Sequence, residues 1–344
     1  MKINGKNERI KREYARYLRD ARGQSDSSID AELASIARFE AFYRSRDFAA
    51  FRNRHASAFK EHLALCRNER TRGRIAETTQ LHILSGLRKF FVWLADEDGY
   101  RSRIKRSDAD YFNLGRRQTA IARTVRDVEG PTIDQVRRVV ETMPHATEVE
   151  MRDRAVMAFA MLTGARDNAI ASVRMKHLDL AKSVVVQDAR DVRTKASKTI
   201  ETWFFPVGEP FAGILEDWVA HLQEQWLWGL DDPLFPKTHI TVSDNRRFAA
   251  GGLMRECWAT ATPIRAIFKR EFERCGLPYF NPHSLRKTLV RLGQERCQTP
   301  EQFKAWSQNL GHENVLTTFT SYGHVARTRQ REIILGLGGQ PSAV

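Results

Sequence analysis

Apolar residues recur at spacings of three and four through the first part of the chain, with polar residues between them. This is the period of an amphipathic α-helix. Three runs show it: Ile29, Leu33, Ile36, Phe39 and Tyr43; Phe59, Leu63 and Cys66; and Ile83, Leu87, Phe90, Phe91 and Leu94. No alternating strand pattern or tight hairpin turn separates these runs. We therefore predict a small all-helical domain over residues 1–105, in which residues 1–20 are a polar, basic helix or arm.

The helical pattern breaks down over residues 106–130. Its periodicity is poor, Gly115 and Gly130 interrupt it, and several arginines give it positive charge. We interpret this stretch as a basic interdomain linker. A second domain is expected over residues 131–344, with residues 324–344 as its C-terminal tail.

The second domain mixes helical and strand patterns. An apolar helix is predicted over residues 154–163; it ends at Gly164, and Arg166 follows. The β-rich runs at 183–187 (SVVVQ) and 201–207 (ETWFFPV) flank a polar, basic segment and predict an antiparallel hairpin. Further helices are predicted over residues 211–228, 262–275, 281–295 and 300–310. The predicted fold is mainly α with a small antiparallel β-sheet: a helical N-terminal domain followed by a mixed α+β domain.

Two helix starts carry the capping-box pattern. Thr132 is followed three residues later by Gln135, and Thr299 is followed in the same way by Gln302. In this motif the threonine hydroxyl and the glutamine amide each satisfy one backbone N–H of the first turn. We therefore expect helices to begin directly after each threonine.

The charge of the chain points to a polyanionic partner. Its 344 residues carry a formal charge of +14 and a pI near 9.9. No apolar run approaches the roughly 20 residues of a membrane-spanning helix, and the N-terminus lacks the apolar stretch of a secretory signal. We expect a cytoplasmic, nucleoid-associated protein that binds DNA or RNA and no membrane. The basic residues that either follow a phosphate backbone or form a solvated face are Arg52, Arg54, Lys60, Arg67, Arg70, Arg72, Arg74, Arg88 and Lys89.

No metal or nucleotide cofactor is expected. The four cysteines (Cys66, Cys257, Cys275 and Cys297) lie far apart and form no CxxC pair. There is no glycine-rich phosphate-binding loop. The remaining histidines have no metal-ligand spacing: His145, His177, His221, His239 and His324. The tryptophans expected in the core, rather than as platforms for stacked bases, are Trp203, Trp218, Trp226, Trp228, Trp258 and Trp306.

The stretch from Asn281 to Gly323 gathers the strongest candidate chemistry. Asn281 is predicted as a helix N-cap, so His283 and Arg286 lie three residues apart on one face of the first turns. A guanidinium beside an imidazole near a helix N-terminus suits a phosphate. Tyr322, at the end of the stretch, has a phenol that can attack such a phosphate.

These pieces occur in a distinctive order. TGARDNAIASV comes first, then a lysine in the hairpin, then HSLR, then LGH, and then a tyrosine ten residues after the histidine. This order resembles the tyrosine recombinase (phage integrase) family, whose pattern is Arg, Lys, His-x-x-Arg, His or Trp, and Tyr. The resemblance extends by motif over residues 131–336 and by architecture over the helical N-terminal domain, which in the family binds the DNA core site.

The resemblance implies a role for each matching residue. Arg166 and Arg286 would hold the scissile phosphate, and His283 and His312 would add hydrogen bonds and handle protons. Tyr322 would be the nucleophile that forms a 3′-phosphotyrosyl intermediate without a metal ion. A hairpin lysine would protonate the leaving 5′ oxygen. Both Lys195 and Lys198 fit, and Lys198 is preferred slightly because it begins a Lys-Thr pair.

Two positions depart from the family pattern. The family commonly has an acidic residue three positions after its first arginine, where this chain has Ala169. The interval from His312 to Tyr322 is ten residues, whereas nine is common in the family. We expect different support for Arg166 and a loop one residue longer before Tyr322.

The resemblance also implies partners. The expected protein is a site-specific recombinase that acts on double-stranded DNA as a homo-oligomer, a tetramer on paired sites. The tail has an apolar patch that would pack either within its own chain or, as the resemblance implies, on a neighbouring protomer: Ile333, Ile334, Leu335 and Leu337. The alternatives are a catalytically silent DNA-binding protein on the same fold and a strand-relaxing enzyme of the type IB topoisomerase kind.

Overall fold

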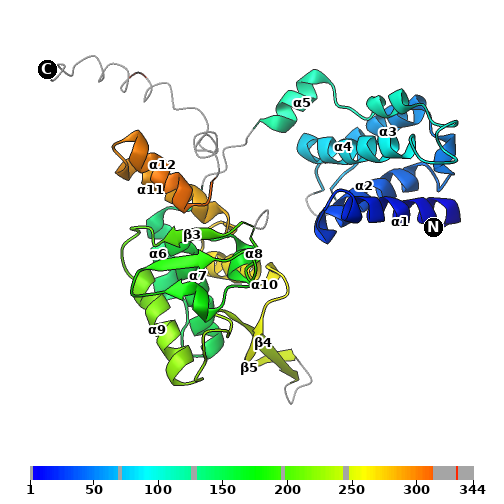
Figure 1. Cartoon of the computed structure of the whole chain (residues 1–344). Coiled ribbons are helices and arrows are strands. Elements are labelled where there is room, and N and C mark those ends of the chain that lie inside the picture. Colours follow the sequence, from blue (N-terminus) through cyan, green and yellow to red (C-terminus); the bar gives the residue numbers. More distant parts are fainter. Residues whose placement is uncertain are drawn as a thin grey trace. The chain divides into compact units, whose positions relative to one another are not determined.

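The computed structural model describes residues 3–68, 72–124, 130–194, 198–242, 248–312 and 331. The chain divides into two compact units, Met1–Val125 and Arg126–Val344 (Figure 1). Each unit has a hydrophobic core of its own. No helix among the described residues is long and apolar enough to cross a membrane.

The named elements of the first unit are all helices in its described part. Its elements are α1 (Gly5–Asp20), α2 (Asp26–Phe42), η1 (Phe48–Ala50), α3 (Asn53–Leu65), α4 (Glu77–Leu94), η2 (Arg106–Tyr111) and α5 (Arg116–Arg123). Phe39 lies at the centre of the core and makes edge-on ring contacts with Phe51, Phe59, Phe91 and Phe112. These contacts bring α2, α3 and α4 together, because edge-to-face geometry favours interlocked rings.

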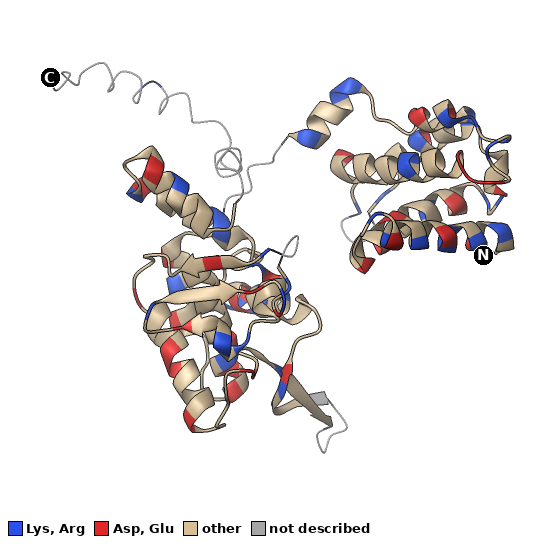
Figure 2. Ribbon diagram, viewed as in Figure 1, with Lys and Arg blue, Asp and Glu red and all other residues tan. Residues whose placement is uncertain are grey.

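The first twenty residues belong to this core. Ile10, Tyr14 and Leu18 of α1 are buried, so the basic helix expected from the sequence is amphipathic and does not form a separate arm. The side chain of Asn7 donates to the Glu40 carboxylate at 2.8 Å and accepts the Phe48 N–H at 3.1 Å. Basic and acidic residues are both distributed along the helices of this unit (Figure 2).

Helical structure continues into the segment that the sequence suggested as a linker. Ala109 of η2 and Phe112 are buried against the first unit's core. The Thr78 hydroxyl of α4 donates to the Ala122 carbonyl of α5 at 3.2 Å. The segment therefore folds onto α4 as far as Arg123, because it supplies apolar side chains despite its poor periodicity.

The second unit combines helices with two small antiparallel sheets. Its helices are α6 (Ile133–Thr142), α7 (Glu148–Thr163), α8 (Asp167–Ile170), η3 (Met175–His177), α9 (Phe211–Glu224), α10 (Thr262–Arg274), α11 (Ser284–Arg296) and α12 (Pro300–Asn309). The strands β1 (Leu178–Asp179), β2 (Val184–Gln187) and β3 (Ile200–Trp203) form one sheet in that order, and β4 (Pro236–Val242) pairs with β5 (Phe248–Cys257) in the other. This mainly α fold with small antiparallel sheets confirms the predicted class.

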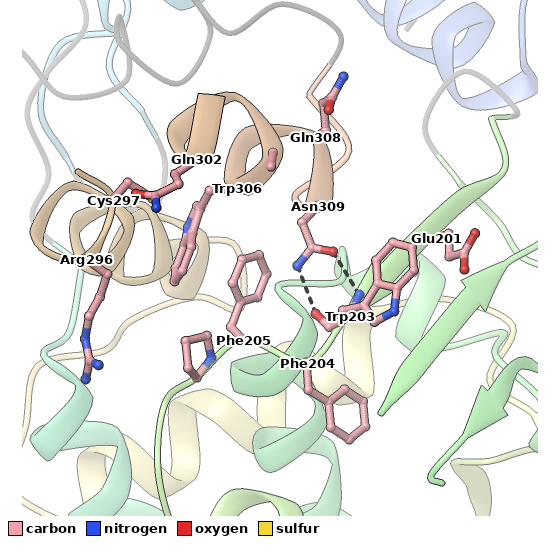
Figure 3. A pocket seen from close by; sticks show the side chains of 12 residues that line it. Glu201, Trp203, Phe204, Phe205, Arg296, Cys297, Gln302, Trp306, Gln308 and Asn309 are labelled. Carbon is pink, nitrogen blue, oxygen red and sulfur yellow. Dashed lines mark hydrogen bonds between the residues drawn. The ribbon is translucent and has the colours of Figure 1, made fainter. Parts of the chain in front are cut away.

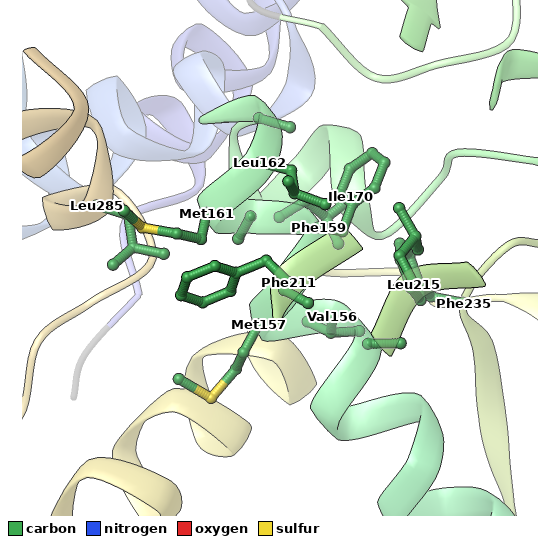
Figure 4. Packing of buried hydrophobic residues seen from close by; sticks show 14 of the residues in the cluster. Val156, Met157, Phe159, Met161, Leu162, Ile170, Phe211, Leu215, Phe235 and Leu285 are labelled. Carbon is green, nitrogen blue, oxygen red and sulfur yellow. The ribbon is translucent and has the colours of Figure 1, made fainter. Parts of the chain in front are cut away.

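Helix α7 is the centre of the second core. Its residues from Ala155 to Thr163 are all buried, so it is covered on every side. Phe159 makes an edge-on contact with Phe235, and Figure 4 shows Met161 beside Leu285 of α11. Deep burial fixes the C-terminal end of α7, from which Arg166 follows.

Local signals placed several helices correctly. Both predicted capping boxes form: the hydroxyls of Thr132 and Thr299 accept the backbone N–H groups of Gln135 and Gln302 at 3.1 and 3.2 Å. Two helices were predicted too long, since α9 ends at Glu224 and α11 begins at Ser284.

The hairpin formed by β4 and β5 was not predicted from the sequence. Its base is fixed by the buried Arg152, which donates to the Pro236 carbonyl and the Thr238 hydroxyl at 2.9 Å each. The same guanidinium stacks over the Trp258 ring at 4.8 Å. Arg152 lies more than 80 residues before the strand that it binds, and a contact between residues so far apart produces no periodic pattern in the sequence.

The prediction that all six tryptophans lie in the core was also wrong for two of them. Trp203 is 53% exposed and Trp226 is 37% exposed. Trp203 lies on the solvent face of β3, where the alternation of strand side chains turns it outward.

We predict that Gly164→Ala destabilises the second unit. Gly164 ends α7 with φ of +59°, and an added Cβ would lie 2.9 Å from the side chains of Leu289 and Leu310. Strain in the left-handed region and the clash together should lower the free energy of unfolding by more than about 1 kcal/mol. Chemical denaturation of the two proteins measures this difference in the free energy of unfolding. Gly213→Ala in α9 is the matched control, because nothing lies within 4 Å of its added Cβ. Equal stability of the two variants would contradict the prediction.

Candidate active site

The first arginine of the pattern follows the turn that ends α7. Gly164 caps the helix in a left-handed conformation, and the Ala165 N–H donates to the Thr163 hydroxyl at 3.1 Å. Arg166 is then the N-cap of the short helix α8 and is half-buried. The turn therefore places Arg166 two residues after the glycine that ends the buried helix α7.

The second arginine is held by a tight turn at the start of α11. Asn281 does not cap an α-helix as predicted; its side chain accepts the Ser284 N–H at 3.1 Å in a turn before the helix. The Arg286 N–H donates to the His283 carbonyl at 3.2 Å, which is a bond of the 3₁₀ type. His283 and Arg286 still lie three residues apart on one face.

The last histidine is placed by the C-terminal cap of α12. The Gly311 N–H donates to the Gln308 carbonyl at 2.7 Å and the His312 N–H donates to the Ser307 carbonyl at 3.2 Å. This pair of bonds is a Schellman motif, which needs a left-handed residue after the cap. Gly311 supplies it with φ of +68°.

Arg286 connects these three segments. Its guanidinium donates to the Gly164 carbonyl and to the Leu310 carbonyl at 2.5 Å each. Nη2 also lies 2.9 Å from Nε2 of His312. Only 5% of Arg286 is exposed, so the ends of α7 and α12 meet at one buried cation.

The electrostatics of the site are strongly positive. Burial, and after it the charges of Arg286, Arg166 and His283, lower the pKa of His312 to about 4. Burial and the same two arginines also lower the pKa of His283. Both imidazoles are therefore neutral near pH 7. Because a guanidinium only donates, Nε2 of His312 accepts and the neutral ring carries its proton on Nδ1.

Ala169 occupies the position where the resemblance led us to expect an acid. It is 2% exposed and packs in the core, so a carboxylate there would be buried. The neighbouring Asp167 instead accepts from Arg265 of α10 at 2.6 Å. This ion pair ties the first turn of α8 to α10.

Arg193 binds the backbone at the C-terminal end of α8. Its guanidinium donates to the carbonyls of Ala171, Trp258 and Ala259. Its backbone N–H donates to the Ser172 hydroxyl at 2.9 Å. The sequence marked Arg193 only as one of the basic residues between the two β-rich runs, and bonds to backbone carbonyls leave no motif that would assign it this role.

The structure thus brings Arg166, His283, Arg286 and His312 together. Lys198 is exposed and lies two residues before β3. Lys195 and Tyr322 lie outside the described residues, as does the loop that joins His312 to Tyr322. Among the described residues, no group of three His, Cys, Asp or Glu side chains is placed to hold a metal ion.

Comparison with known families agrees with this arrangement. The sequence model described as "Phage integrase family" matches residues 132–329. The chain belongs to the phage integrase family. It is an enzyme of the tyrosine-recombinase type, and residues 12–99 match a second model of this family, "Phage integrase, N-terminal SAM-like domain".

Individual integrases resemble the chain over nearly its whole length. A protein of Sinorhizobium fredii that carries the name of an integrase/recombinase, y4rF, is 24% identical over 336 residues, which are 95% of this chain and 68% of the relative. The Tn1549 transposon integrase in complex with right-end DNA has a TM-score of 0.62 at 15% identity and covers 96% of this chain and 99% of its own. XerH recombinase bound to difH substrate has a TM-score of 0.61 at 14% identity, and the match covers 94% of this chain and 82% of the XerH chain.

We predict that His312 stays neutral in the free integrase until the pH falls to about 4. Its imidazole resonances, followed by NMR against pH, should show this low pKa. Arg166→Gln should raise the pKa of His312 and of His283, because one of the nearby positive charges is removed. The unfolded chain takes up these protons near pH 6.5, so the free energy of unfolding should decrease as the pH falls from about 6.5 to about 4. A His312 that titrates near 6.5 would contradict the geometry.

Proposed function

We propose that this integrase cuts and rejoins double-stranded DNA through a 3′-phosphotyrosyl bond to Tyr322. The observation that carries the proposal is the convergence of two guanidinium groups and two imidazoles, with both imidazole pKa values lowered by both arginines. Such a site attracts a phosphodiester and stabilises the charge that builds on its non-bridging oxygens.

The reaction needs one nucleophile and one acid. The Tyr322 phenolate attacks the phosphorus, a phosphorus–oxygen bond to the tyrosine forms, and the bond to the 5′ oxygen breaks. Lys198 or Lys195 gives a proton to the departing 5′ oxygen. The phosphotyrosine then accepts the 5′ hydroxyl of another strand, and the reverse proton transfer restores the lysine. Arg166 and Arg286 hold the phosphate throughout, so the steps proceed without a metal ion.

The proposed partner is supported by the relatives and by the first unit. The similar XerH and Tn1549 integrase structures contain DNA substrates. In the first unit, Arg67 and Arg74 face each other across an antiparallel bridge and are both exposed. Two like charges directly opposite are unfavourable in a free protein, and a phosphate backbone offsets that repulsion.

The first test is covalent trapping in EDTA. The target sequence is obtained with nicked duplexes whose sequence is randomised around the nick: molecules bound covalently to the protein are recovered on a denaturing gel and sequenced. The wild-type integrase should form the adduct without divalent metal. Tyr322→Phe should abolish the adduct and leave DNA binding unchanged.

Each alternative gives a different outcome in this test. A silent DNA-binding protein would bind the recovered duplexes and form no adduct. A strand-relaxing enzyme would form the adduct on single duplexes and relax supercoiled plasmid without exchanging strands between two sites. An adduct that survives Tyr322→Phe would exclude the proposed nucleophile.

We further propose that the integrase acts as a tetramer on paired DNA sites, with the apolar tail residues of one protomer docked on the next. Truncation after Gly323 retains Tyr322 and removes Ile333, Ile334, Leu335 and Leu337. Sedimentation of complexes on the recovered DNA should then show mainly smaller assemblies. Unchanged assembly would mean that the tail makes no contact between protomers.

A further inference from the structure

The side chain of Asn309, the last residue of α12, binds the backbone of a strand. Its Oδ1 accepts the Trp203 N–H at 2.8 Å, and its Nδ2 donates to the Trp203 carbonyl at 2.9 Å (Figure 3). The Asn309 backbone carbonyl also accepts the Thr202 hydroxyl at 3.0 Å. Three hydrogen bonds thus join one residue of α12 to two residues of β3.

This contact satisfies the open edge of the sheet. The Phe204 N–H donates to the Ser183 carbonyl at 2.8 Å, and Val184 pairs with Trp203 in the register of β2 and β3. In an antiparallel ladder the inward-pointing and outward-pointing backbone groups alternate, so the N–H and C=O of Trp203 point away from β2. The carboxamide of Asn309 offers the donor and the acceptor that a neighbouring strand would offer.

The contact between α12 and β3 is also packed closely at Gly311, two residues after Asn309, and at Ile200, three residues before Trp203. A Cβ added to Gly311 would lie 2.9 Å from Cδ1 of Ile200. The chain at the end of α12 therefore contacts β3 both at Ile200, the first residue of the strand, and at Trp203, its last residue. Since Gly311 also completes the cap that places His312, the strand and the histidine are set by one contact region.

The contact between Asn309 and β3 connects the lysine-bearing segment with the pair of Arg286 and His312. Strand β3 begins two residues after Lys198, and the segment with both candidate lysines leads directly into it. On the other side, His312 and the Leu310 carbonyl are bonded to Arg286. Asn309 binds β3 through its side chain and precedes Leu310 in the chain, so it links these two groups.

We propose that Asn309 is a positioning residue, which holds the lysine-bearing hairpin in register with the arginine–histidine site. This inference rests on the proposed function above. Without the two carboxamide bonds, β3 is expected to shift against α12, and the lysine then protonates the leaving oxygen poorly. A displacement of about 1 Å at a catalytic group costs on the order of 100-fold in rate.

The test compares two leaving groups in single-turnover cleavage. One recovered duplex carries the ordinary 5′ oxygen at the scissile phosphate, and a matched duplex carries sulfur in its place. A thiolate leaves without a proton, so the sulfur duplex does not need a placed lysine. Asn309→Ala should slow cleavage of the oxygen duplex roughly 10- to 100-fold and cleave the sulfur duplex at nearly the wild-type rate.

Two further variants serve as a second test of Asn309 and as a control. Asn309→Asp retains the acceptor for the Trp203 N–H and places a carboxylate against the Trp203 carbonyl, so it should show the same selective loss. It also serves as the test if the alanine variant does not fold. Gln308→Ala removes the adjacent exposed carboxamide and should cleave both duplexes normally.

The outcomes separate this inference from the proposed function. Equal slowing on both duplexes, or no slowing on either, would overturn the positioning role of Asn309. A wild-type protein that forms no adduct with either duplex would instead overturn the proposed function. Thermal melting of each variant confirms that the rates belong to folded protein.

Discussion

The site depends on one buried guanidinium. Arg286 is almost completely removed from solvent, and a buried cation is tolerated only where acceptors surround it. The acceptors are backbone carbonyls at the ends of two helices, together with a histidine nitrogen. Helix ends have free carbonyls because the last turn lacks intrahelical partners. The C-terminal ends of α7 and α12 therefore come together at Arg286. Gly164 and Gly311 end these helices in the left-handed conformation that this arrangement needs.

The local part of this arrangement was predictable from the sequence. Gly164 marked the end of an apolar helix, and the HSLR and LGH motifs named the residues that converge on Arg286. The helices also followed the apolar period, because burying an apolar stripe is what stabilises them. Those signals are short-range, since each concerns residues within one or two turns of one another.

The long-range part was not predictable. The β4–β5 hairpin is held by Arg152, and the joint between α12 and β3 is held by Asn309. In both cases a polar side chain binds the backbone of a segment far away in sequence. The sequence of the bound segment is irrelevant to such a bond, because every residue except proline offers the same N–H and C=O. No motif in a single sequence records it.

Ala169 stands where an acid was expected, and the contacts around α8 come from other residues. Asp167 pairs with Arg265 of α10, and Arg193 donates to the carbonyl of Ala171, the C-cap of α8, and to the carbonyl of Trp258. These contacts fix the two ends of the short helix whose N-cap is Arg166. The positive field at the two imidazoles is retained without a carboxylate at position 169.

The most direct measurement identifies the atom that is joined to DNA. The adduct formed in EDTA is digested with protease and nuclease, and the remaining peptide–nucleotide conjugate is sequenced by mass spectrometry. We expect a single conjugate in which the Tyr322 phenol carries the 3′ phosphate of the broken strand. A conjugate on another residue, or one through a 5′ phosphate, would contradict the phosphate site built around Arg286.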